Sequence, residues 1–223
     1  INAVGTRSIV EVFGESSHIT YLSTDLVFSG NSPPVGGYSE TDTPDPVSVA
    51  GATFVHAENH IRQAPSWTII RLGLPLGPSV TGDKGAVDWI ESRFVRDLPV
   101  TLFYDEYRSC ISCAEIARIT LSALLNGLKG LYHLGGPNSW SLFEVGKRVL
   151  SRASYPSHLL TGLRRHQEKE GPPRIGDVSL DSRLIETALG DTITPVTDIR
   201  APGPCVSSDV PPVSVRCRGK QTN

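Results

Sequence analysis

Hydrophobic positions along the chain follow two spacings, one typical of helices and one typical of buried strands. Helical spacing appears at the start of the chain, where Val4, Ile9, Val10 and Phe13 recur at the intervals expected of one helix face. Short apolar runs rich in β-branched residues separate the helical segments and are typical of strands buried on both faces. The pattern predicts helices at 2–16, 47–64, 86–97, 113–127, 141–153 and 181–190, and strands at 18–23, 66–77, 99–104 and 130–136.

Helices alternating with apolar strands indicate an α/β fold, with a parallel sheet covered by helices on both faces. Such sheets bind ligands at the carboxyl ends of their strands, so polar residues that follow strands become the candidate site residues. The candidates are Ser23, Thr24 and Asp25 after the first strand, Leu74 and Pro75 after the second, and Asp105 and Arg108 after the third.

Composition narrows the classes of protein. The formal net charge of −2 argues against a general nucleic-acid binder, which normally carries a basic excess. No apolar run approaches the length of a membrane span, and no signal segment opens the chain, so we expect a cytoplasmic protein with no membrane partner. The chain lacks methionine and begins with Ile1, from which we expect a start further upstream or a trimmed chain. The aperiodic residues 198–223 predict a disordered tail.

Four cysteines leave three interpretations open. Cys110 and Cys113 form a CxxC, but Cys205 and Cys217 are too far apart to complete a zinc ribbon. Cys113 is expected at a helix start, where the pKa of a thiol falls. We favour two small residues on a loop that enters a helix, with a redox or zinc site as the alternatives.

Three stretches in a fixed order carry a family resemblance. They are "STDLVFSG" at 23–30, "YSETDTPDP" at 38–46, and the segment 50–58, which ends in a glutamate. Together with "IIRLGLPLG" at 69–77 and the segments from 130 and 177, they resemble the extended short-chain dehydrogenases/reductases, and most of all the dTDP-4-dehydrorhamnose reductases. The resemblance covers roughly residues 2–195.

The resemblance implies a partial Rossmann-like sheet plus a small C-terminal substrate-binding region. Residues 1–77 are then the C-terminal half of an NAD(P)-binding domain, and residues 78–197 a substrate-binding region with the last Rossmann strand. It also implies NAD(P) as cofactor and a nucleotide-linked sugar as ligand. Ser23 and Pro75 become candidate cofactor contacts, and Thr24, Asp25, Leu74 and Arg108 candidate substrate contacts.

The glycine-rich loop that opens the family's dinucleotide site is absent. Such a loop lets backbone N–H groups approach a pyrophosphate, and neither GxxGxxG nor GxGxxG occurs in this chain. We therefore expect the chain alone not to bind NAD(P). Without the first half of the fold, the strand at 19–22 has an unpaired edge, which predicts poor solubility or a protein partner that covers it.

The catalytic pair of the family is absent as well. The resemblance assigns carbonyl hydrogen bonding to Thr24, but Ala50 stands at the position of the family's tyrosine and Phe54 at that of its lysine. Thr24 could equally be a simple strand-end cap. Tyr104 and Tyr107 are the neighbouring tyrosines that could replace the lost acid.

Other polar residues have structural interpretations. His56 and His60 have metal-ligand spacing but fit an exposed helix face better, because the zincin glutamate is out of place. We expect His133 to be a hydrogen-bonded core histidine and Arg71 to form an ion pair behind its strand.

Three function classes remain. The first is an NAD(P)H-dependent reductase or epimerase of a sugar nucleotide, with this chain catalytically impaired. The second is a non-catalytic nucleotide-sugar-binding or regulatory subunit, a role known because the regulatory beta subunit of methionine adenosyltransferase also resembles this family. The third is a CxxC redox or metal protein.

Overall fold

The computed structural model describes residues 2–79, 85–168 and 171–199. Its helices are α1 (Asn2–Phe13), α2 (Val49–Ile61), α3 (Ala86–Val95), α4 (Cys113–Leu125), α5 (Leu142–Arg152) and α6 (Arg183–Leu189). Its strands are β1 (Ile19–Thr24), β2 (Trp67–Leu72), β3 (Leu74–Leu76), β4 (Val100–Phe103), β5 (Tyr107–Ser112), β6 (Gly130–Leu134), β7 (Ser139–Ser141) and β8 (Leu160–Leu163). Short 3-10 helices occupy Asp25–Val27, Ser157–Leu159 and Arg165–Gln167.

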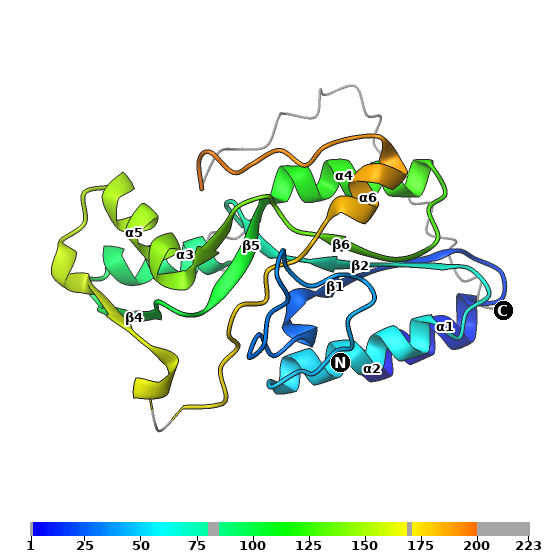
Figure 1. Cartoon of the computed structure of the whole chain (residues 1–223), viewed down its shortest axis with the longest axis horizontal. Coiled ribbons are helices and arrows are strands. Elements are labelled where there is room, and N and C mark those ends of the chain that lie inside the picture. The colour runs from blue at the N-terminus through cyan, green and yellow to red at the C-terminus, as the bar shows by residue number, and fades with distance from the viewer. Residues whose placement is uncertain (1, 80–84, 169–170, 200–223) are drawn as a thin grey trace, which may run out of the picture.

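The main sheet is parallel, with the strand order β1-β2-β6. Helices α1 and α2 lie on one face, and α4 and α6 lie on the other (Figure 1). On the α4 and α6 face, Ile70 and Leu134 of the sheet are buried against Ile119 and Ile185 of the two helices. The predicted α/β class, a parallel sheet with helices on both faces, is confirmed.

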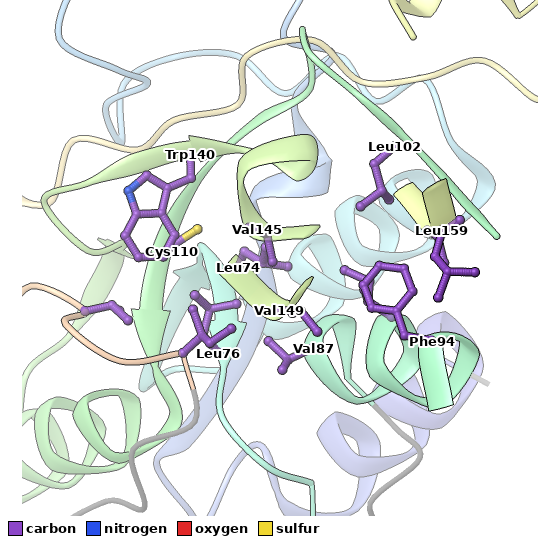
Figure 2. Packing of buried hydrophobic residues seen from close by; sticks show 14 residues of the cluster. Leu74, Leu76, Val87, Phe94, Leu102, Cys110, Trp140, Val145, Val149 and Leu159 are labelled. Carbon is purple, nitrogen blue, oxygen red and sulfur yellow. The ribbon is translucent and has the colours of Figure 1, made fainter. Parts of the chain in front are cut away.

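A second region, called the lobe below, lies beside the main sheet on the left of Figure 1. It contains the sheets β3-β5-β7 and β4-β8 together with α3 and α5. Its core brings Leu74 of β3, Phe94 of α3, and Val145 and Val149 of α5 into one apolar cluster (Figure 2). Helix α5 begins at the predicted capping box, in which Ser141 and Glu144 bond each other's backbone N–H groups.

The strand predicted at 66–77 is in fact two strands in two sheets. The chain leaves the main sheet at Gly73, between β2 and β3. A Cβ at this position would lie 2.1 Å from the carbonyl oxygen of Ser109, so only glycine lets β5 approach so closely. The predicted domain boundary at residue 77 stays a prediction, while the chain passes from the main sheet to the lobe at Gly73.

Three strands were not predicted from the sequence, and two residues that were expected on a loop lie on one of these strands. Strands β5, β7 and β8 are short or mostly polar, so hydrophobic periodicity did not reveal them. As a result, Arg108 and Cys110 lie on β5 and not on the loop that was predicted there. The tail predicted at 198–223 lies, from residue 200 onward, outside the described residues, as do Cys205 and Cys217.

Helix α1 is present where predicted, but its apolar side chains are not buried. Val4, Ile9 and Phe13, which defined the helix in the sequence, are all more than half exposed, and Thr6 is the buried residue of the helix. The helix packs mainly along α2, and its buried Thr6 hydrogen-bonds Tyr21 of β1. Its hydrophobic face therefore has no cover among the described residues.

No helix within the described ranges is long and apolar enough to cross a membrane.

Candidate functional site

The carboxyl end of β1 carries the candidate residue Thr24. Its hydroxyl accepts a hydrogen bond from the backbone N–H of Leu26 at 3.3 Å and donates one to Asp25 Oδ1 at 3.2 Å. Thr24 thus caps the short 3-10 helix that follows β1. The capping interpretation is present in the geometry, while the ligand role of Thr24 stays a prediction.

Asp25 and Arg108 form an ion pair that joins the main sheet to the lobe. Arg108 Nε donates to Asp25 Oδ2 at 2.5 Å, and Arg108 Nη2 donates to Asp25 Oδ1. Asp25 is fully buried, and the Arg108 side chain is 11% exposed. Burial raises the pKa of Asp25 above its ordinary value, while the charge and hydrogen bonds of Arg108 act in the opposite direction. The Asp25 carboxylate and the Arg108 guanidinium are paired with each other. The ligand contacts predicted for these two residues stay predictions.

Ser23 belongs to a buried network behind β1. Its hydroxyl donates to Glu58 Oε1 at 2.6 Å, and Arg71 donates to both oxygens of the same carboxylate, at 2.9 and 2.7 Å. Glu58 and Arg71 are both almost completely buried. The structural ion pair expected for Arg71 is confirmed, and Glu58 is a partner that the sequence did not single out. The cofactor contact predicted for Ser23 stays a prediction.

His133 continues this network on β6. Its Nδ1 lies 2.8 Å from the carbonyl oxygen of Tyr38, which makes Nδ1 the protonated nitrogen, and its Nε2 lies 3.4 Å from Arg71 Nη1. Burial lowers the pKa of His133 to about 4. The hydrogen-bonded core histidine expected from the sequence is confirmed.

Helix α2 displays the two positions where the family's acid and lysine would stand. Ala50 is exposed in the first turn, which is capped by Ser48. Phe54 lies one turn later and is half-buried, with its ring centroid 6.3 Å from that of Tyr21. The helix presents a methyl group and an aromatic ring here, and neither carries an exchangeable proton.

The two tyrosines that could replace the acid point elsewhere. The ring of Tyr104 is 4.3 Å from that of Phe143 and also fills the space above Gly162, so it belongs to the lobe's packing. Tyr107 precedes Arg108 on β5, and successive strand side chains point to opposite faces. Because Arg108 points at Asp25, Tyr107 points away from it.

The glycines at the carboxyl ends of β2 and β6 provide a test for a dinucleotide phosphate. A Cβ on Gly135 would lie 2.5 Å from Ser109 Cβ, and one on Gly136 would lie 1.9 Å from the Cys110 carbonyl oxygen. Like Gly73, these glycines are required by the close approach of β5. That packing explains why they are glycines, so they are no evidence for a phosphate-binding loop at these two strand ends.

Leu74 and Pro75, the candidates after the second strand, both lie on β3. Leu74 is buried in the lobe core and Pro75 is exposed, so their predicted ligand contacts stay predictions.

A cavity of about 680 Å³ opens at the carboxyl end of β6, lined mainly by Gly36, Gly136, Ser182 and their neighbours. Thr24 and Asp25 are not among its lining residues.

Cysteine chemistry gains no support from the geometry. Burial raises the pKa of the Cys110 thiol to about 12 and also raises that of Cys113, contrary to the lowering expected at a helix start. Cys113 does begin α4, as expected. Within the ranges that the structure describes, no group of three or more ligand-type side chains could hold a metal ion, and this includes His56 and His60.

Comparison with known proteins gives one family match and several relatives. The family model described as RmlD substrate binding domain matches residues 1–198. The chain is 25% identical over 187 residues to methionine adenosyltransferase 2 subunit beta of Danio rerio, a match that covers 80% of this chain and 57% of that protein. It is 28% identical over 134 residues to the probable low-salt glycan biosynthesis reductase Agl14 of Haloferax volcanii, covering 58% of this chain and 43% of that protein. The chain thus spans about half the length of these relatives.

Solved structures show the same fold. The dTDP-4-dehydrorhamnose reductase of Bacillus anthracis, in complex with NADP, superposes with a TM-score of 0.75 at 22% identity, covering 87% of this chain and 68% of that one. A hypothetical dTDP-4-dehydrorhamnose reductase of Sulfolobus tokodaii gives 0.72 at 27% identity, covering 88% and 67%. The chain belongs to the RmlD substrate binding domain family, among the extended short-chain dehydrogenases/reductases that its motifs resemble.

Proposed function

We propose that this chain is a catalytically impaired member of its family that retains the binding of a nucleotide-linked sugar. The observation that supports the proposal is that the first two turns of α2 present Ala50 and Phe54, at the positions that the motif order assigns to the family's tyrosine and lysine. Thr24 still follows β1, where it can hydrogen-bond a ligand carbonyl once its weak bond with Leu26 is exchanged.

Carbonyl reduction needs a proton donor as well as a hydride. Ala50 has no proton to give, and Phe54 can neither lower the pKa of a neighbouring acid nor hold a ribose hydroxyl. A missing general acid typically lowers the rate by about 10²–10⁴. That loss corresponds to roughly 3–5 kcal/mol of barrier. The orientations of Tyr104 and Tyr107 support the proposal, because neither side chain is directed toward Thr24.

NAD(P) is the family's cofactor, and it is bound in the reductase of Bacillus anthracis. The glycines at the ends of β2 and β6 are required by the close approach of β5 and give no evidence of a site for its phosphates. We expect the isolated chain to bind NADPH negligibly, and a micromolar dissociation constant by titration calorimetry would contradict this.

A protein partner is the second candidate function. Two relatives are named as the beta subunit of methionine adenosyltransferase 2. Among the described residues, β1 is the last strand on its side of the sheet, and such a strand can pair with another polypeptide segment.

The decisive experiment joins this chain to the remaining part of a related reductase. The part of the Bacillus anthracis reductase that this chain does not match would be fused ahead of residue 1. NADPH oxidation would then be measured with dTDP-4-dehydrorhamnose. We expect trace turnover, and a clear gain in the Ala50→Tyr/Phe54→Lys version. Ordinary enzymatic turnover with Ala50 and Phe54 in place, unchanged by Tyr104→Phe and Tyr107→Phe, would overturn the proposal.

A further inference from the structure

Three candidate ligand residues, Thr24, Asp25 and Arg108, are bonded to one another in this structure. The Thr24 hydroxyl donates to Asp25 Oδ1, and Arg108 donates to both oxygens of the same carboxylate. Asp25 is completely buried, whereas the Arg108 side chain is 11% exposed. The polar groups that a ligand at this strand end would use are therefore occupied by internal bonds.

Arg108 reaches Asp25 from the lobe. It lies on β5, in register with Trp140 of the antiparallel strand β7, so the two side chains share one face of this sheet. Cys110, two residues further along β5, lies on the same face. Because Trp140 and Cys110 are buried and carry no negative charge, Asp25 is the group that balances the guanidinium in the part of the chain that the structure describes.

Backbone groups hold the same boundary between the main sheet and the lobe. The N–H of Gly176 donates to Ser29 O at 2.7 Å. The N–H of Asp177 donates to Gly30 O at 3.0 Å. A Cβ on Gly176 would lie 2.0 Å from the Gly30 carbonyl oxygen, so the two regions meet here without spare room. These bonds can persist while the Arg108 side chain changes its partner.

The chemistry of Arg108 indicates which ligand could take the place of Asp25. A guanidinium donates two parallel hydrogen bonds to a carboxylate or to a phosphate with the same geometry. While Asp25 accepts both bonds, Arg108 is not available to a ligand phosphate. A ligand would then bind only the fraction of molecules in which the pair is open, and its apparent affinity falls by that fraction.

We propose that the Asp25–Arg108 pair is an autoinhibitory contact, in which the Asp25 carboxylate competes with a ligand phosphate for Arg108. Asp25 then sets how tightly the site binds its ligand. This inference deepens the binding of a nucleotide-linked sugar proposed above, and it rests on that proposal for the identity of the ligand.

The test is titration calorimetry of the full chain, with dTDP and inorganic pyrophosphate as probes. Asp25→Asn keeps the size of the side chain but removes the competing charge, so it should tighten the binding of both probes about tenfold or more. Arg108→Met should weaken binding. The double variant Asp25→Asn/Arg108→Met should bind no more tightly than Arg108→Met alone. A purely structural ion pair would instead weaken binding when either partner is changed.

The matched control is Asp191→Asn, which releases Arg118 of α4 from its own ion pair, away from Thr24. It should bind both probes like the unmodified chain. The proposal is overturned if Asp25→Asn binds no more tightly than the unmodified chain, if its gain survives in the double variant, or if the control gains equally.

A measurement on the unmodified chain keeps the proposal testable if Asp25→Asn does not fold. In NMR spectra of the arginine side chains, pyrophosphate should shift the guanidinium signal of Arg108 and leave that of Arg71, which is paired with Glu58, in place. An unshifted Arg108 signal would overturn the proposal. If Asp25→Asn binds pyrophosphate through Arg108 but binds dTDP-4-dehydrorhamnose no more tightly, the sugar-nucleotide function fails and the autoinhibitory contact is supported.

Discussion

The two edges of the main sheet differ in how the chain finishes them. At the β6 edge, the outward N–H of His133 donates to Glu40 Oε1 at 2.7 Å, and the His133 ring bonds the carbonyl of Tyr38. The loop that carries Tyr38 and Glu40 thus closes this edge with its own polar groups. At the β1 edge, no residue in the described ranges plays the equivalent part.

The difference shows that the described residues cover the outer edge of β6 and not that of β1. Native proteins commonly block an exposed strand edge with a charged side chain or a covering loop, and Glu40 is such a block. Among the described residues, the half-buried carboxylate of Glu40 blocks the β6 edge, and β1 carries no such block.

The largest expected effect comes from breaking the ion pair that lies between the two edges. Arg71→Met removes the buried cation that donates to both oxygens of Glu58 and leaves only the partly exposed Arg62, 3.7 Å away, so it should cost about 3 kcal/mol of unfolding free energy or more. Denaturant titration measures this loss. The double variant Arg71→Met/Glu58→Leu should recover much of it, and equal losses in both variants would contradict the assigned pairing.

Lowering the pH should reduce the free energy of unfolding through His133 at the β6 edge. His133 has a folded pKa of about 4, below the ordinary value of 6.5, so the unfolded chain binds a proton first as the pH falls. The contribution of neutral His133 to the free energy of unfolding is therefore complete above pH 6.5. It is lost as the pH falls from 6.5 to 4, to a total of about 3 kcal/mol. The pH dependence of the denaturation midpoint checks this. His133→Asn, which keeps a donor for Tyr38 O, should flatten the curve in that window.

Removing the block on the closed edge should have a smaller effect. Glu40→Ala leaves the N–H of His133 without its acceptor, at a cost of about 1–3 kcal/mol, and gives the sheet a second uncovered edge. Thermal unfolding measures the loss, and light scattering should show more self-association. Glu40→Gln retains an oxygen acceptor and should behave almost normally; a Gln variant as impaired as the Ala variant would contradict the role assigned to Glu40.

The smallest effect on stability should come from the outer edge of β1. Leu22→Lys changes an exposed side chain and should shift the unfolding free energy by no more than about 0.5 kcal/mol. It should nevertheless increase the concentration at which the chain stays monomeric, because a lysine on an edge strand discourages pairing. A loss of several kcal/mol would show that Leu22 is part of the folded core.

Sequence patterns predicted the fold better than the contacts. The long helices and the strands β1, β2 and β6 follow from periodicity. The assignment of Ala50 and Phe54 to the family's tyrosine and lysine positions rests on the motif order and stays a prediction. The pairing of Asp25 with Arg108 could not be foreseen, because it joins residues 83 positions apart and depends on the undetected strand β5. Hydrophobic spacing also predicted helix α1, but it could not show that Val4, Ile9 and Phe13 are more than half exposed in the part of the chain that the structure describes.

The comparison of the two edges is tested most directly by amide hydrogen exchange on the unmodified chain, followed residue by residue. The N–H groups of Tyr21 and Ser23, which face β2, and of His133, which Glu40 covers, should be protected. Those of Thr20 and Leu22 should exchange roughly 100-fold faster or more, because no strand within the described ranges lies beside them. Equal protection of Leu22 and Tyr21 in the monomeric chain would mean that β1 already has a neighbour on its outer side, and would contradict the account.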